Sequence, residues 1–96
     1  MATKSKLERA VEDRAGRLGV AQRELVLSQL SVYRGNNARM SHIKDRLAAI
    51  DSAPDSTLDE VRVKQASRST LSYEYNQLST ANSRIAVDLF KLLEEI

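Results

Sequence analysis

A regular apolar stripe in the last quarter of the chain places the strongest constraint on its fold. Its positions are separated by alternating steps of four and three residues: Leu71, Tyr75, Leu78, Asn82, Ile85, Leu89, Leu92 and Ile96. This is the a and d pattern of a heptad repeat, in which one side of an α-helix packs against another helix. Strand side chains alternate with a period of two, so a sheet does not produce this spacing. The stripe therefore predicts an all-α protein.

A turn precedes the helix that carries the stripe. Residues 51–56 contain the only proline of the chain, flanked by Asp and Ser, which are typical of tight surface turns. Ser56 and Thr57 each stand three residues before an acidic side chain, which is the spacing of a helix N-cap and its capping partner. No glycine or proline follows the turn. We therefore predict one uninterrupted helix over residues 57–96, roughly 60 Å long at ~1.5 Å per residue.

The first half of the chain predicts a second helix of similar length, over about residues 5–50. It opens with Ser5 and Glu8, which have the spacing of a capping box. Gly16 and Gly19 each cost about 1 kcal/mol relative to Ala inside a helix. This arm is therefore predicted to be weaker than the last one. Its apolar stripe contains Leu7, Val11, Leu18, Ala21, Leu25 and Val32.

Residues 35–37, Gly-Asn-Asn, interrupt the pattern of the first arm. Gly and Asn readily end a helix, and the apolar register also shifts, because the stripe extended from Val32 reaches Arg39. Either the helix breaks here, or it continues through a kink or a local change in winding. Good helix formers restart at once from Ala38, which favours continuity.

Two long arms joined by a short turn predict a single antiparallel helical hairpin, coiled-coil-like and oligomeric. The domain spans residues 1–96, with arm one over about 5–50, the turn over 51–56 and arm two over 57–96. The chain has no Trp, one Phe and three Tyr, so its core must be built from aliphatic side chains, which suits packed helices.

The charge of the two halves supports the same arrangement. Residues 1–50 carry 10 Lys/Arg and 5 Asp/Glu, whereas residues 51–96 carry 5 Lys/Arg and 8 Asp/Glu. A basic half and an acidic half suit two helices laid against each other, within one chain or between chains. Chance drift among solvated helix faces is the alternative explanation of this difference.

Apolar residues beside the stripe indicate contacts between copies of the chain. Ala86, Phe90 and Leu93 widen the apolar face beyond what one partner helix covers. Asn82, on the stripe, is the kind of polar residue that fixes helix register or oligomer number. We therefore predict a homo-oligomer whose interface residues are Leu71, Tyr75, Leu78, Asn82, Ile85, Leu89, Phe90, Leu92, Leu93 and Ile96.

Nothing in the sequence predicts catalysis. His42 is the only histidine, it lies on the flank of a predicted helix, and no nucleophile is placed beside it. The chain has no cysteine, and a zinc site made of carboxylates alone is not expected. The three glycines are scattered and form no phosphate-binding loop. We predict a protein that is not an enzyme and that has no cofactor and no metal ion.

Basic residues in the first arm raise the question of nucleic-acid binding, since Arg side chains contact phosphates. Acidic residues are interleaved with them, and no aromatic platform or recognition-helix motif accompanies them, so this is the third hypothesis. The arginines concerned are Arg9, Arg14, Arg17, Arg23, Arg34 and Arg39.

The chain has no stretch that approaches the ~18 apolar residues needed to span a membrane. Its charged beginning also lacks the apolar segment of a Sec signal peptide. We expect a soluble protein made in the cytoplasm, and export by a route without a cleaved signal stays open.

Three segments carry a resemblance to a known family. Residues 45–56, which include the Pro-Asp turn, and the apolar tail from Ile85 to Leu93 resemble type III secretion needle subunits, as does the polar run of Ser72, Tyr75, Asn76, Ser79 and Thr80. These subunits are small helical hairpins that polymerise into a hollow filament. The resemblance covers residues 45–93 and implies a filament subunit. The chain departs from the family in lacking a second proline after the turn, and in its basic, heptad-like residues 1–40.

Two functions agree best with these patterns. The first is a structural subunit that self-associates through heptad helix packing, as in a secretion-needle-like filament. The second is a small helical chaperone or adaptor of a secretion or phage machine, whose exposed seam binds a helix of a partner protein. Growth of oligomers with concentration favours the first, and a stable small oligomer that awaits a partner favours the second.

Overall fold

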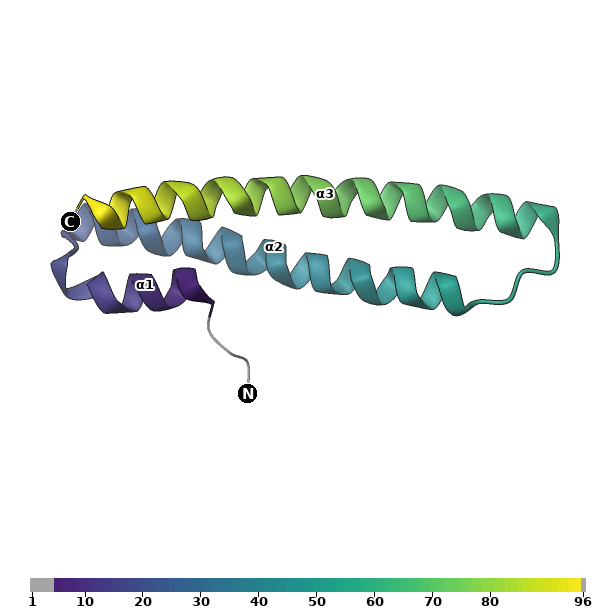
Figure 1. Cartoon of the computed structure of the whole chain (residues 1–96), viewed down its shortest axis with the longest axis horizontal. Helices are drawn as coiled ribbons and strands as arrows, with labels where there is room; N and C mark the ends of the chain where they lie inside the picture. The colour runs from purple at the N-terminus through teal and green to yellow at the C-terminus, as the bar shows by residue number, and fades with distance from the viewer. Residues whose placement is uncertain (1–4, 96) are drawn as a thin grey trace.

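The computed structural model describes residues 5–95 as a rod of 60 × 26 × 17 Å. Its elements are helix α1 (Lys6–Arg14), the single 3₁₀ turn η1 (Ala15–Arg17), helix α2 (Val20–Ser52) and helix α3 (Leu58–Glu94). No strand occurs in this part of the chain. The predicted all-α hairpin is confirmed, since α2 and α3 run antiparallel and pack against each other (Figure 1).

Helix α2 continues through residues 35–37, which confirms the favoured prediction of a continuous helix at this point. None of the described residues adopts a positive φ angle, so Gly35 does not end the helix in a left-handed conformation. A Cβ atom at Gly35 would have no neighbour within 4 Å. This glycine is therefore required neither by the backbone conformation nor by close packing.

The first arm is not one helix over 5–50, because it breaks at residues 15–19. Helix α1 ends at Arg14, one 3₁₀ turn follows, and Leu18 and Gly19 are extended. Gly16 and Gly19 disfavour a continuous helix at this point. Folding back lets α1 lie along the hairpin (Figure 1). In this position α1 contacts α3. The glycines that predicted a weak helix therefore mark a chain reversal.

The helix starts follow the predicted capping chemistry. The Ser5 hydroxyl accepts a hydrogen bond from the Glu8 amide at 3.2 Å, and the Thr57 hydroxyl accepts one from the Glu60 amide at 3.1 Å. Thr57, not Ser56, is thus the N-cap of α3. Each bond satisfies a helix amide that has no partner within its own helix, a contribution of about 1 kcal/mol.

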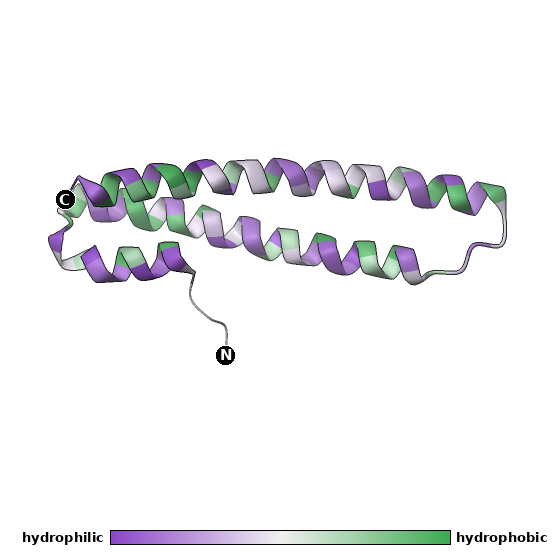
Figure 2. Cartoon of the chain, in the orientation of Figure 1, coloured by the Kyte–Doolittle hydropathy of each residue, from purple (hydrophilic) through white to green (hydrophobic). Residues whose placement is uncertain are grey.

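The hydrophobic core lies at one end of the rod, where all three helices meet. We call residues 5–33 and 85–95 the three-helix end. In Figure 2 the ribbon at this end carries many positions coloured as hydrophobic, whereas the middle of α3 is mostly coloured as hydrophilic. The buried cluster consists of Leu7, Val11, Leu18, Val26, Leu30, Leu89 and Leu93, with Ala10, Tyr33, Ile85, Ala86 and Leu92 packed against it.

Residues 38–81, which we call the two-helix segment, contain much less core. Ile43 is the one apolar side chain that is buried in this part of the chain. Lys64 and Ser67 occupy half-buried positions of α3 where apolar residues would be expected in a regular seam. No helix of the described residues is both long and apolar enough to cross a membrane.

Candidate interaction surface

The described residues offer no constellation that indicates metal binding. Residues 5–95 contain no group of three or more His, Asp or Glu side chains placed to hold a metal ion. His42 is exposed on α2. The features that remain are the helix seam, its polar centre and the apolar residues that the fold leaves at the surface.

The predicted stripe does form the inner side of α3. Asn82 and Leu89 are buried, and Ile96 lies outside the described residues. The stripe residues that are half-buried are Leu71, Tyr75, Leu78, Ile85 and Leu92. Much of the predicted interface is therefore occupied by the chain's own helices.

The two flanking residues of the predicted interface differ in their surroundings. Leu93 is buried in the core of the three-helix end, where α1 covers it, so it is not available to another copy. Phe90 is exposed at 38% of its surface. Nearer the start of α3, the ammonium group of Lys44 in α2 lies 5.7 Å from the centre of the Tyr75 ring. This cation–π contact links the two helices.

A cluster of side-chain amides lies at the boundary between the two regions of the rod. Asn82 accepts a hydrogen bond from Asn36 at 2.9 Å and donates to the Asn37 side chain at 2.9 Å and to the Tyr33 carbonyl at 3.2 Å. No described side chain that is buried has an unpaired polar atom. The amides that suggested a helix break thus belong to this cluster, which pairs only in one register of α2 against α3.

Helix α1 covers only one side of the hairpin. Arg34 of α2 forms an ion pair with Glu8 of α1 at 3.3 Å, so this side of α2 faces α1. Leu25 lies nine residues earlier, about 180° around the helix at ~100° per residue. Val32, seven residues after Leu25, falls on the same side as Leu25. Leu25 and Val32, the part of the first-arm stripe that lies in α2, therefore face away from α1.

The uncovered side carries a shallow groove between α2 and α3 that apolar and polar residues line together. Leu25 and Leu92 line this groove, which has a volume of about 380 Å³. We define the open strip as five residues of this side: Leu25, Gln29 and Val32 of α2, and Ile85 and Leu92 of α3. Three of them, Leu25, Gln29 and Leu92, line the groove. Leu25 and Val32 keep 53% and 49% of their surface exposed, while Ile85 and Leu92 are half-buried.

Charged groups of both signs border the open strip. Asp88, Lys91 and Glu95 line the same groove as Leu25 and Leu92. Because carboxylates and an ammonium group alternate along this edge of α3, the rim has no single sign. Such a rim does not select an anionic or a cationic partner by charge alone.

One ion pair links the predicted basic and acidic arms at mid-rod. Arg39 donates two hydrogen bonds to the Glu74 carboxylate, at 2.8 and 3.0 Å. These bonds and the positive charge lower the pKa of Glu74, with a smaller contribution from His42, and the same bonds raise the pKa of Arg39. Near the turn the polarity is reversed, because Asp51 of α2 pairs with Arg68 of α3 at 3.2 Å. The opposite net charges of the two arms therefore explain only some of the ion pairs between α2 and α3.

The sequence pattern identified Leu25 and Val32 but assigned them to the first-arm stripe together with Leu7, Val11 and Leu18. The break at residues 15–19 changes the register, so that Val26 and Leu30 face the core in their place. Gly16 and Gly19 were the sequence signal for this break.

Comparison of the chain with models of known families, with curated proteins and with solved structures finds no match.

Proposed function

We propose that this chain is a non-enzymatic assembly subunit that self-associates by packing the open strips of two copies against each other. The observation that supports this is the pair Leu25 and Val32, which are about half exposed at heptad spacing on the side that α1 leaves uncovered. Heptad positions that remain exposed in a monomer are the positions at which a further helix packs.

A second copy suits the open strip better than an unrelated charged partner. The rim of the strip contains Asp88, Lys91 and Glu95. A two-fold axis brings the same patch of both copies together, and a rim that carries both signs allows opposite charges to meet. Each copy thus supplies the apolar surface and the counter-charges that the other copy needs.

The expected contact is of modest strength. Burying the exposed half of a Leu or Val side chain is worth about 1 kcal/mol. Leu25 and Val32 from two copies together contribute about 4 kcal/mol, against which the loss of translational and rotational freedom must be set. Ile85 and Leu92 add the remainder of their surfaces. Association is therefore expected to be weak, with a Kd of about a millimolar or weaker.

A matched pair of substitutions tests the proposal. Leu25→Asp places a charge in the open strip, whereas Leu27→Asp makes the same change at a side chain of nearly equal exposure, 53% against 54%. Leu27 is two residues further, about 200° around α2 and so away from the strip. In sedimentation equilibrium, Leu25→Asp should have a clearly lower weight-average mass than the unchanged chain at the same protein concentration, and Leu27→Asp should associate like the unchanged chain.

Melting curves of both variants control for folding and should agree with that of the unchanged chain at low concentration. A chain that stays monomeric at every concentration, or equal association of the two variants, contradicts the proposal. Growth beyond the two-fold dimer supports an assembly subunit, and a dimer that does not grow further favours the adaptor hypothesis. Electron microscopy of concentrated protein tests the filament that the resemblance of residues 45–93 to needle subunits implies.

A further inference from the structure

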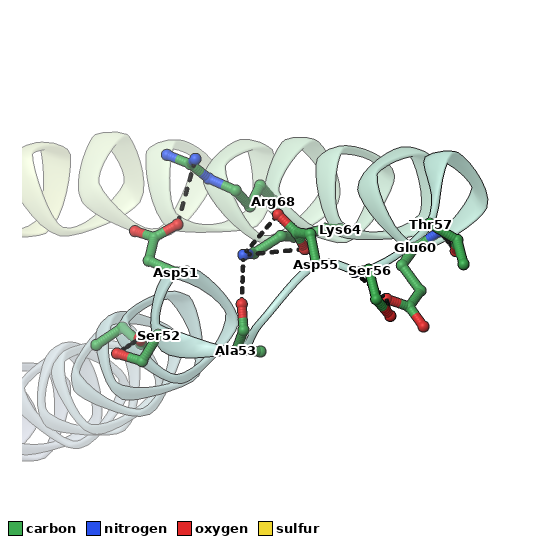
Figure 3. A network of polar contacts seen from close by, with 10 residues as sticks. Asp51, Ser52, Ala53, Asp55, Ser56, Thr57, Glu60, Lys64 and Arg68 are labelled. Carbon is green, nitrogen blue, oxygen red and sulfur yellow. Dashed lines mark hydrogen bonds and ion pairs between the residues drawn. The ribbon is translucent and has the colours of Figure 1, made fainter.

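The turn between α2 and α3 is held in place by a lysine of α3. The Lys64 ammonium group donates a hydrogen bond to the Ala53 carbonyl at 2.9 Å and lies 3.3 Å from the Asp55 carboxylate (Figure 3). Ala53 is the C-cap of α2, so the cation also meets the negative end of the helix dipole. One side chain thus joins the end of one helix to the start of the other.

A carboxylate fixes the other half of the turn. Glu60 accepts hydrogen bonds from the Ser56 amide at 2.7 Å and from the Ser56 hydroxyl at 2.9 Å (Figure 3). These bonds lower the pKa of Glu60, because they favour its charged form. The turn is therefore ordered by side-chain bonds, although its residues are exposed. An ordered turn loses little conformational freedom when it binds a partner.

The ordered turn surrounds an apolar hollow of about 390 Å³. Its apolar lining comes from Ile50, Ala53, Pro54 and Val63. Its charged lining consists of the carboxylates of Asp55, Asp59 and Glu60 and the ammonium group of Lys64. Val63 keeps 66% of its surface exposed, so the hollow opens to solvent.

The charge around this hollow is locally negative. Residues 51–60 contain four carboxylates and no Lys or Arg. Arg68 and Lys64 pair with two of them, Asp51 and Asp55. The hollow therefore suits an apolar side chain that is accompanied by cationic groups.

The opposite end of the rod presents such a group. Val20, the first residue of α2, keeps 80% of its surface exposed, more than any other described large apolar side chain. Residues 14–24 around it contain three arginines and one glutamate. One of these arginines, Arg23, is anchored by a hydrogen bond to the Ala15 carbonyl at 3.1 Å. Figure 1 shows this corner and the α2–α3 turn at opposite ends of the molecule.

We propose that the hollow at the turn receives the Val20 corner of a second copy. The two surfaces differ, so the contact is heterologous and repeats head to tail along the rods. This inference rests on the proposed self-assembly, to which it adds a second contact. The end of the rod measures about 26 by 17 Å, which is less than the ~800 Å² per partner of a stable interface. The contact alone is therefore weak and appears at high protein concentration.

Three substitutions of Val by Asp test this contact in the Leu25→Asp variant, in which the open strip is blocked. Val63→Asp alters the hollow and Val20→Asp alters the corner. Val87→Asp is the control, because Val87 is exposed by 52% on α3 and lines neither surface. Asp at the first position of α2 also agrees with the helix dipole, so Val20→Asp should fold. Circular dichroism melting checks all three.

The expected readout is the weight-average mass in sedimentation equilibrium at millimolar protein. The mass should rise with concentration for the Leu25→Asp parent and for its Val87→Asp derivative, and should stay at the monomer value for the Val20→Asp and Val63→Asp derivatives. An equimolar mixture of the last two retains one intact hollow and one intact corner. Its mass should therefore rise again, but to no more than twice the monomer mass.

The results separate this contact from the open strip. A mixture that stays monomeric, or a parent that shows no rise in mass, overturns the head-to-tail contact. The proposed contact between open strips is still supported in that case if Leu25→Asp alone has lowered the mass relative to the unchanged chain. Conversely, if Leu25→Asp associates like the unchanged chain while Val20→Asp and Val63→Asp reduce the mass, the strip is wrong and the head-to-tail contact holds.

Discussion

The three-helix end and the two-helix segment are built from the same pair of long helices, yet different interactions hold them together. At the three-helix end, α1 closes one side of the hairpin, and seven buried apolar residues form a continuous cluster. In the two-helix segment, Ile43 is the one buried apolar residue, and ion pairs and a cation–π contact connect the helices. A third helix thus decides where a core forms.

This difference follows from how helices bury surface. Two helices cover only one narrow stripe of each other, so the side chains at the edges of the stripe stay partly exposed. A third helix covers one of those edges. The two-helix segment lacks this cover, and its turn is instead fixed by Lys64 and Glu60. Both proposed contacts use apolar side chains that no third helix of the same chain covers.

The largest effect is expected from truncation of a buried residue at the three-helix end. Leu93→Ala removes a side chain that is 2% exposed and should lower the free energy of unfolding by about 2–5 kcal/mol. Leu71→Ala, at a half-buried position of the two-helix segment, should cost about 1–2 kcal/mol. Urea unfolding measures both. Equal costs would show that the two regions are stabilised alike.

The boundary between the regions depends on Asn82. Asn82→Ala should lower the free energy of unfolding by about 1–3 kcal/mol, because Asn36, Asn37 and the Tyr33 carbonyl lose a partner. Asn76→Ala is the control, since Asn76 is an exposed asparagine of the same helix. Thermal unfolding of the two variants compares them. A similar loss in both would mean that the amide cluster adds nothing beyond helix propensity.

Two glycines should respond to Ala with opposite signs. Gly35→Ala should raise the free energy of unfolding by about 1 kcal/mol, because Gly35 is inside α2 and its Cβ would enter open space. Gly19→Ala should lower it by about 0.5–1 kcal/mol, because Gly19 is the N-cap of α2 at the three-helix end. Urea unfolding of both variants gives the signs. A stabilising Gly19→Ala would argue against the chain reversal at this residue.

The helical conformation of the arms and the position of the turn could be predicted from the sequence because they depend on local patterns. The spacing from Leu71 to Leu92 and the capping residues Ser5 and Thr57 each act within a few residues of the chain. The continuity of α2 through residues 35–37 could be favoured on the same grounds.

The fold of the first arm depends on distant contacts that a local pattern does not contain. Gly16 and Gly19 weakened the predicted helix, but the direction in which α1 folds back is set by packing of Leu7 and Val11 against α3. Asn82 is predicted from its place on the stripe to fix helix register or oligomer number, but the stripe does not reveal that Asn36 and Asn37 are its partners. The apolar hollow at the turn had no sequence signal, since it arises where two helices meet.

The smallest predicted effect is a loss of order in the two-helix segment at acid pH. Glu74 and Glu60 have lowered pKa values in the folded chain, through hydrogen bonds from Arg39 and Ser56 respectively. A group whose pKa is lowered by folding stabilises the fold fully above its unfolded pKa, about 4.3 for Glu. This contribution is lost as the pH falls through the folded value. Amide exchange, expressed relative to the intrinsic exchange rate at each pH, should therefore be faster in the two-helix segment at pH 3 than at pH 6.

Both carboxylates are exposed, so this effect is small, and high salt should reduce it further. The Glu60→Gln and Glu74→Gln double variant should exchange at pH 6 much as the unchanged chain does at pH 3, and should lose most of its own dependence on pH. If acid instead increases exchange mainly at the three-helix end, the segment that lacks a third helix does not depend on these ionic bonds. The contrast between a core held by apolar packing and a segment held by charge would then not apply to this rod.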